Sequence, residues 1–289
     1  MGMRSFRVKM SENIDKLKTL VELNQSTAAR NIFCIHPAGG GVSYYEGIAK
    51  ELSDVAKVYA LDDPVIYDDF DYRSLPELAE YHLETIQEVQ ESGRYTLFGY
   101  CSGGPLAYEI AKQLILEGKE VERVVMFGSK IVTGFDSTVP EKYLFLRDYL
   151  GARFGLQLTS LDWPSFESRG IPKVSKAIVD LLVEQKVEGI SNNIHWVDRS
   201  IQALVMMREA QKRYRAGNSS MDIDLYQWNY ADSEAAAKTA PWCDWERLTT
   251  GRLNMFRPPK KVEDHLDIMF VPYLAETVKK VKAYSLACS

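Results

Sequence analysis

The sequence predicts an α/β fold with a mostly parallel sheet and helices on both of its faces. The chain has 289 residues, of which 46% are apolar, enough to bury one large core. After residue 30, short apolar runs alternate with amphipathic stretches, which is the pattern of parallel strands joined by crossover helices. One of the apolar runs continues directly into a glycine-rich turn and then a helix.

The elements follow in order along the chain. Ser74 is expected to cap a long helix that extends to about Gln90, with Glu77 completing a capping box. A helix with apolar residues at helical spacing from Tyr45 to Val55 is expected before it, another begins near residue 103, and a terminal helix covers 274–284. The expected strands are 32–35, 57–61, 95–99, 121–127, 223–228 and 253–256.

The alternation stops between about 138 and 217, where the sequence is mostly helical in pattern. An insertion of this length over a sheet is typical of a lid. The sequence therefore predicts one domain. Residues 31–137 and 218–289 form its core, 138–217 form a helical lid insertion, and 1–30 form a linker or N-terminal segment.

Composition excludes several classes of function. The net charge of −5 and the lack of a basic block argue against nucleic-acid binding. No apolar stretch is long enough for a membrane span or resembles a secretory signal, so a cytoplasmic location is expected. The four cysteines are scattered without a Cys-x-x-Cys pair, so neither a disulfide framework nor a metal site is expected.

The strongest motif is the sequence from Gly99 to Gly103, which fits the nucleophile elbow of α/β hydrolases, with Cys101 in the central position. The two glycines are needed because the central residue stands on a sharp turn. The dipole of the following helix is expected to favour the thiolate. Ser102 is the rival nucleophile, although Tyr100 would then occupy the first glycine position; a plain buried cysteine is the structural alternative.

Four histidines compete for the role of base. His265 follows the last strand and precedes the last helix, which is where this fold places its base. His82 is expected on a helix as a surface or packing residue. His195 lies in the lid, as a surface or substrate-contact residue, and His36 is expected to shape the glycine-rich loop.

The acid that orients the histidine is expected at Asp232, after strand 223–228, with a plain surface aspartate as the alternative. Asp222 and Asp224 enter that strand at its far end, and Asp264 adjoins the histidine itself. The oxyanion hole is expected from the backbone amides of Ser102 and Ala38. The Gly39–Gly41 run lacks the spacing of a nucleotide-binding loop.

Together these motifs resemble the terminal thioesterase domains of nonribosomal peptide synthetases and polyketide synthases. The resemblance covers about residues 20–285, with 138–217 matching only as a variable lid. It is carried by residues 33–40, 58–61, 97–107, 245–251 and 264–266. It implies that an upstream peptidyl carrier protein domain delivers a peptidyl or acyl thioester on phosphopantetheine, and that the domain binds no cofactor of its own.

Two departures from the family pattern matter. Most of the family has serine at position 101, and it usually has its catalytic aspartate at position 128, where this chain has Gly128. A cysteine nucleophile keeps the acyl group activated as a thioester, which suits closure of a strained ring. A thiol also needs less activation than a hydroxyl. Release as a β-lactam or β-lactone is therefore expected, as the few cysteine-type members suggest by resemblance.

Three alternatives stay open from the sequence. The first is hydrolytic release of a linear acid. The second is a stand-alone editing thioesterase that clears misloaded carrier domains. The third is a non-catalytic hydrolase fold that acts as a binding module, which the missing aspartate at position 128 would suit.

Overall fold

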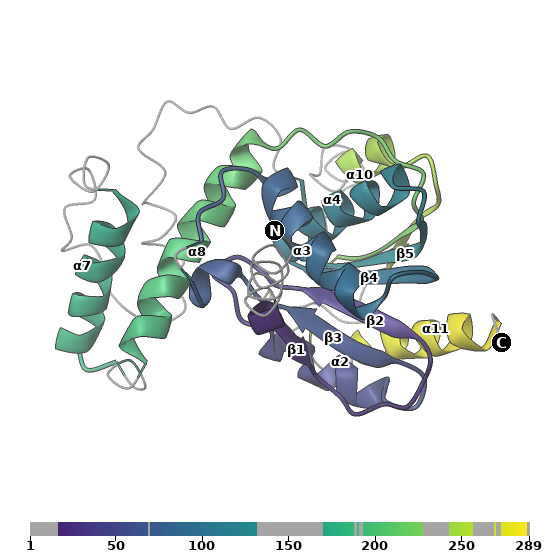
Figure 1. Ribbon diagram of the computed structural model, residues 1–289, viewed down its shortest axis with the longest axis horizontal. Coiled ribbons are helices and arrows are strands. Elements are labelled where there is room, and N and C mark those ends of the chain that lie inside the picture. Colours follow the sequence, from purple (N-terminus) through teal and green to yellow (C-terminus); the bar gives the residue numbers. More distant parts are fainter. Residues whose placement is uncertain are drawn as a thin grey trace, which may run out of the picture.

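The computed structural model describes residues 17–68, 70–131, 170–187, 190, 193–227, 243–256, 269 and 273–287. Within these ranges the strands form one seven-stranded sheet in the order β1-β3-β2-β4-β5-β6-β7 (Figure 1). β1 runs antiparallel to β3, and every other neighbouring pair is parallel. The strands are β1 Leu20–Glu22, β2 Asn31–Ile35, β3 Lys57–Leu61, β4 Arg94–Tyr100, β5 Glu120–Phe127, β6 Ile223–Tyr226 and β7 Leu253–Phe256.

Helices cover both faces of this sheet, as the α/β prediction required (Figure 1). α3, α4 and α10 pack on one face, and α2 and α11 pack on the other. The helical elements are η1 Leu17–Thr19, η2 Ser43–Tyr45, α2 Glu46–Glu51, η3 Pro64–Ile66, α3 Leu75–Val89, α4 Gly103–Leu116, α7 Ile171–Glu184, α8 Ile194–Arg213, α10 Cys243–Leu248 and α11 Tyr273–Ala287.

β2 shows why both faces are apolar. Phe33 and Ile35 contribute to the core beneath α3 and α4, whereas Ile32 and Cys34 contribute to the core beneath α2 and α11. Successive side chains of a strand point to opposite faces, so a strand covered on both sides must be apolar throughout. Each fully buried side chain of this size contributes about 1.5–3 kcal/mol.

Three elements differ from the sequence expectation. β1 was not predicted, and it adds an antiparallel edge strand in the segment expected as a linker. The helix expected from Tyr45 to Val55 is shorter, because η2 precedes it and α2 ends at Glu51. At α3, the Ser74 hydroxyl accepts from the Glu77 amide at 3.4 Å, but the Glu77 carboxylate accepts from the Arg73 amide instead of closing the capping box.

The described helices of the segment expected as a lid are α7 and α8, which stand at one end of the sheet (Figure 1). α7 packs along α8 through a small apolar cluster that includes Val174, Ile178 and Leu182. The carboxyl end of α8 is fixed to α4, because the Tyr214 hydroxyl donates to buried Glu109 at 2.6 Å. This contact anchors α8 to the core.

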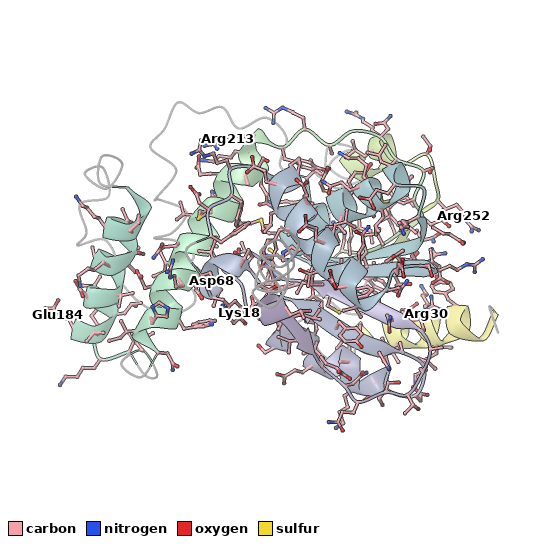
Figure 2. The ribbon with its side chains drawn as sticks, in the orientation of Figure 1. Lys18, Arg30, Asp68, Glu184, Arg213 and Arg252 are labelled. Carbon is pink, nitrogen blue, oxygen red and sulfur yellow. The ribbon has the colours of Figure 1, made fainter. Side chains whose placement is uncertain are left out.

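The amino ends of the strands carry ion pairs. Arg30 pairs with Glu122, and Arg123 lies 3.0 Å from Asp224. Figure 2 shows Arg30 and Arg252 on the side of the sheet away from α7 and α8. The carboxyl ends therefore face α7 and α8. Among the described helices, none is long and apolar enough to cross a membrane.

Candidate active site

Cys101 stands at the turn between β4 and α4 in a left-handed backbone conformation, with φ of 54°. Its amide donates to the Phe127 carbonyl at 2.9 Å, and its carbonyl accepts from the Gly104 amide at 3.3 Å. A left-handed residue other than glycine costs on the order of 1–2 kcal/mol. The turn therefore holds Cys101 in a strained position above the carboxyl edge of the sheet. The neighbouring Ser102 has φ of −65° and is already helical.

The flanking glycines are required by space. A Cβ on Gly99 would lie 2.4 Å from the Gly103 carbonyl oxygen. A Cβ on Gly103 would lie 2.4 Å from the carbonyl oxygen of Ile35 and 2.8 Å from that of His36. Neither approach is sterically allowed, so the turn closes only with glycine at both places.

The same close approach brings the turn against the loop that follows β2. Ile35 pairs with Gly99 in the parallel register of β2 and β4, so both segments leave the sheet at the same level. The structure therefore places Ala38 and Ser102, expected to supply the oxyanion amides, on two neighbouring segments. Ala38 is half-buried and packs against the α8 cluster.

Tyr45 joins these two segments beneath the surface. Its hydroxyl donates to the Ile35 carbonyl and accepts from the Tyr100 amide, both at 2.7 Å, and the side chain is fully buried. Tyr100 directly precedes Cys101, and Ile35 directly precedes the glycine-rich loop. One side chain therefore fixes the starting points of both functional segments.

Asp62, at the end of β3, holds the glycine-rich loop. One carboxylate oxygen accepts from the Gly41 amide at 2.7 Å and from the Asp63 amide at 2.8 Å, and the other accepts from the Tyr67 hydroxyl at 2.9 Å. Gly40 has φ of 71°, and a Cβ there would lie 2.9 Å from the same carboxylate. The loop geometry is thus fixed by a residue that the sequence alone did not single out.

A buried polar network lies beneath the loop. The Nδ1 of His36 donates to the Pro37 carbonyl at 2.9 Å, because a carbonyl can only accept. The Nε2 atoms of His36 and His82 lie 3.2 Å apart, at hydrogen-bond distance. Asp63 lies 3.8 Å from His36 and accepts from the Tyr72 hydroxyl at 3.1 Å. The network shapes the loop, in keeping with the role expected of His36.

Burial dominates the electrostatics of this network. It lowers the pKa of His82 well below its usual value, with the neighbouring His36 acting in the same direction. Burial raises the pKa of Asp63, and His36 partly opposes that effect. His82 is therefore a neutral buried residue, and its Nδ1 has no hydrogen-bond partner among the described residues.

The ionisation equilibrium of Cys101 is shifted toward the protonated thiol. Burial raises its pKa, while the Ser102 backbone amide and the charge of Lys130 lower it. The net direction is upward. Desolvation therefore outweighs the neighbouring groups that favour the thiolate, and the thiol needs a base to ionise.

The end of β5 carries no carboxylate. Gly128 is there, with its amide donating to the Tyr226 carbonyl at 2.7 Å. The Ser129 hydroxyl points back into the fold and donates to the Gly99 carbonyl at 3.3 Å. Asp222 and Asp224 lie at the opposite edge, paired with Arg252 and Arg123, as their positions in the sequence suggested.

Helix α8 reaches the turn through Gln211. The Ser102 hydroxyl donates to Gln211 Oε1 at 3.4 Å, and Gln211 Nε2 donates to the Ser102 carbonyl at 3.5 Å. No feature of the sequence indicated this contact, which joins residues 109 positions apart. His265 and Asp232, expected as base and acid, lie outside the described residues, as does Asp264. Within the described ranges, no group of three or more His, Cys, Asp or Glu residues is arranged to hold a metal ion.

A mostly parallel sheet, helices on both faces and a strained residue on a strand-to-helix turn define an α/β-hydrolase fold. Comparison with known families then matches part of the chain to one family within this fold. Residues 30–134 match the family model of the thioesterase domain.

The curated relatives are large synthases. Over 111 residues the chain is 40% identical to tyrocidine synthase 3 of Brevibacillus parabrevis, an alignment that covers 38% of this chain and 2% of that protein. Over 139 residues it is 34% identical to the conidial pigment polyketide synthase alb1 of Aspergillus fumigatus, covering 47% of this chain and 6% of that one. The chain therefore spans only a small part of the relatives it matches.

Solved structures share the fold. A four-domain nonribosomal peptide synthetase with bound AMP and glycine aligns with a TM-score of 0.67 at 19% identity, over 92% of this chain and 20% of that one. The thioesterase domain that cyclises the lipopeptide antibiotic surfactin aligns with a TM-score of 0.56 at 21% identity, over 93% and 96%. At these identities the similarity establishes the fold.

Proposed function

We propose that this domain is a thioesterase that takes a peptidyl or acyl chain from the phosphopantetheine thioester of a carrier protein domain onto Cys101 and then releases it. The observation that carries the proposal is the strained conformation of Cys101 on the turn against the loop of Ala38. Ser102, the rival nucleophile, is helical and makes its hydroxyl contact with Gln211. The thioesterase family match over residues 30–134 supports the same activity.

The proposed reaction begins with proton transfer from the Cys101 thiol to His265, which the raised pKa of that thiol makes necessary. The sulfur then attacks the thioester carbonyl. The backbone amides of Ala38 and Ser102 stabilise the resulting oxyanion. The pantetheine sulfur leaves as a thiol with the proton that His265 held, and the acyl chain remains bound to Cys101 as a thioester.

We further propose that release is an intramolecular cyclisation. An amine or hydroxyl of the bound chain attacks the Cys101 thioester, gives its proton to His265, and expels the cysteine sulfur. Because the acyl-enzyme is itself a thioester, it keeps the driving force for closing a strained β-lactam or β-lactone ring. The surfactin thioesterase shows that cyclisation occurs on this fold.

The first experiment is mass spectrometry of the purified protein after incubation with acyl thioesters of N-acetylcysteamine or pantetheine. An acyl adduct on Cys101 is expected, and it should be absent from the C101A variant. A protein that turns over without labelling Cys101 would refute the nucleophile. Labelling by neither substrate, together with no turnover, would favour a binding module.

A product assay separates the modes of release. A cyclic product, lighter than the linear acid by one water, supports ring closure; linear acid as the sole product refutes it and leaves hydrolytic release or editing. Rapid hydrolysis of short acyl groups from carrier proteins would specify editing.

Asp232 is proposed as the acid that orients His265, since the end of β5 has glycine. We expect D232N to lower the rate of acyl-enzyme formation by on the order of 100-fold or more. D222N is the matched control, because Asp222 is paired with Arg252 at the opposite edge. Equal rates for D232N and wild type would show that the acid lies elsewhere or is absent.

A further inference from the structure

Gln211 is the point where the lid helix meets the nucleophile turn. It comes from the last turn of α8 and contacts both the hydroxyl and the carbonyl of Ser102, at 3.4 and 3.5 Å. The Ser102 hydroxyl in turn lies 3.9 Å from the sulfur of Cys101, a contact in which either atom can be the donor. A chain of three polar groups thus connects α8 to the sulfur.

The same helix also lies on the glycine-rich loop. A Cβ on Gly39 would lie 3.3 Å from the Ser200 carbonyl oxygen and 3.6 Å from Leu204 Cβ, so backbone and helix are in close contact there. The Tyr72 hydroxyl, beneath the loop, lies 3.5 Å from the Ala203 carbonyl. α8 therefore contacts both segments expected to supply oxyanion amides, and its position is tied to theirs.

The Ser102 hydroxyl has one proton to donate. While Gln211 Oε1 accepts that proton, the hydroxyl offers only lone pairs to the sulfur, which favours the protonated thiol. When the amide of Gln211 is withdrawn, the hydroxyl is free to donate to the sulfur, which favours the thiolate. The two acceptors compete for one proton.

We propose that Gln211 is a positioning residue that couples the seating of helix α8 to the protonation of Cys101 through the Ser102 hydroxyl. With α8 seated, the nucleophile is held as a thiol. Displacement of α8 by an incoming acyl chain frees the Ser102 hydroxyl to donate a hydrogen bond to the sulfur, which stabilises the thiolate. The nucleophile is then activated only when substrate occupies the space beneath the lid. This coupling rests on the proposed role of Cys101, but it can be measured without turnover.

Other groups also act on this sulfur. Among the described residues, the Lys130 charge from the segment after β5 favours the thiolate, and the buried hydroxyl of Tyr45 on η2 interacts with the thiol electrostatically. Neither contacts Gln211 in the described structure. Both stay constant when Gln211 is changed, so a change at Gln211 isolates the Ser102 contact. His265 would add to these groups and is likewise unchanged by the substitution.

The test is the rate of Cys101 alkylation by iodoacetamide as a function of pH, followed by peptide mass spectrometry so that other cysteines do not interfere. Because only the thiolate reacts, the rate below the inflection follows the thiolate fraction. Q211L is expected to raise this rate about threefold, equivalent to about half a pKa unit. Q211E is expected to lower it, since a carboxylate binds the Ser102 proton more tightly and adds negative charge.

Two comparisons separate coupling from simple opening of the lid. In an S102A background, Q211L is expected to leave the rate unchanged, because no hydroxyl remains to be released. Gln202 lies on the same helix and donates to Asp198 at 2.9 Å, so Q202L is the matched control and should match wild type.

A rate increase of the same size in the S102A background would overturn the proposal, as it would show better access for the reagent. Equal rates for wild type, Q211L and Q211E would overturn it too. If Q211L does not fold, Q211N can replace it. Its side chain is shorter by one methylene group, so the amide lies farther from Ser102, and the rate is expected to change in the same direction. Opposite shifts for Q211L and Q211E would support the coupling even in a protein that shows no thioesterase turnover.

Discussion

The Y45F substitution removes one oxygen atom from the centre of the molecule, and its effect follows from two contacts. The Tyr45 hydroxyl accepts from the Tyr100 amide and donates to the Ile35 carbonyl, each at 2.7 Å. Phenylalanine fills the same space, so the apolar packing of the fully buried ring is kept. The variant therefore isolates the two hydrogen bonds.

The magnitude follows from the groups left behind. A buried amide without an acceptor costs roughly 1–3 kcal/mol, and a carbonyl with a second lone pair loses less. We expect Y45F to lower the free energy of unfolding by about 2 kcal/mol. For a chain of 289 residues this corresponds to a fall in melting temperature of about 3 °C.

Activity should fall as well, because Tyr100 directly precedes the strained residue of the turn. Loss of its amide contact relaxes the turn by a fraction of an ångström, for which a decrease in the rate of acyl transfer of roughly tenfold is expected.

Urea unfolding measures the stability term, and the midpoint should move while the slope with denaturant stays constant. Y59F is the matched control. Tyr59 is half-buried, stacks on Phe33, and lies on the neighbouring strand β3. Its change should be within about 0.5 kcal/mol. If Y45F is as stable as Y59F and equally active, then Tyr45 does not join the two segments as described.

Three further predictions follow. Because burial raises the pKa of the Cys101 thiol, its alkylation rate should still be rising at pH 9, and an inflection below that of free cysteine, about 8.5, would contradict the described environment. Because the folded-state pKa of His82 is lowered, the unfolded chain binds a proton there at a higher pH than the folded chain does, so wild type should lose up to about 1.4 kcal/mol of stability per pH unit below about 6.5. H82L should remove this pH dependence, as measured by urea unfolding at pH 7.5 and 5.5. An equal loss of stability in wild type and H82L would refute the prediction. G103A should lower the free energy of unfolding by more than about 3 kcal/mol and abolish activity, since its Cβ would lie 2.4 Å from a carbonyl oxygen. G217A is the control, because the space around Gly217 is open, and it should leave the free energy of unfolding nearly unchanged in the same measurement.

The sheet could be predicted from the sequence because its central strands are apolar on both faces. The six expected strands are present with their ends within two residues. β1 was missed because Leu20–Glu22 is too short to show a pattern and depends on pairing with β3. The turn at Cys101 could be predicted because its glycine requirement is local.

The support around the site could not be predicted, since it depends on long-range contacts. Tyr45 occupies an apolar position in its helix, so only the structure shows that its hydroxyl joins Ile35 to Tyr100. His36 and His82 are 46 positions apart, and nothing local indicates that they meet. The raised pKa of the Cys101 thiol could not be predicted for the same reason, because the sequence does not show how deeply the sulfur is buried.

The two ends of the strands can be engineered for different properties. Charged partners such as Arg30 with Glu122 and Arg123 with Asp224 gather where the strands begin, whereas the reactive thiol and its supporting loops gather where they end. Substitutions meant to make the domain more heat-resistant can therefore be confined to the first edge. Changes meant to alter which acyl chains are accepted belong on the second, so the two properties can be improved in separate rounds and then combined.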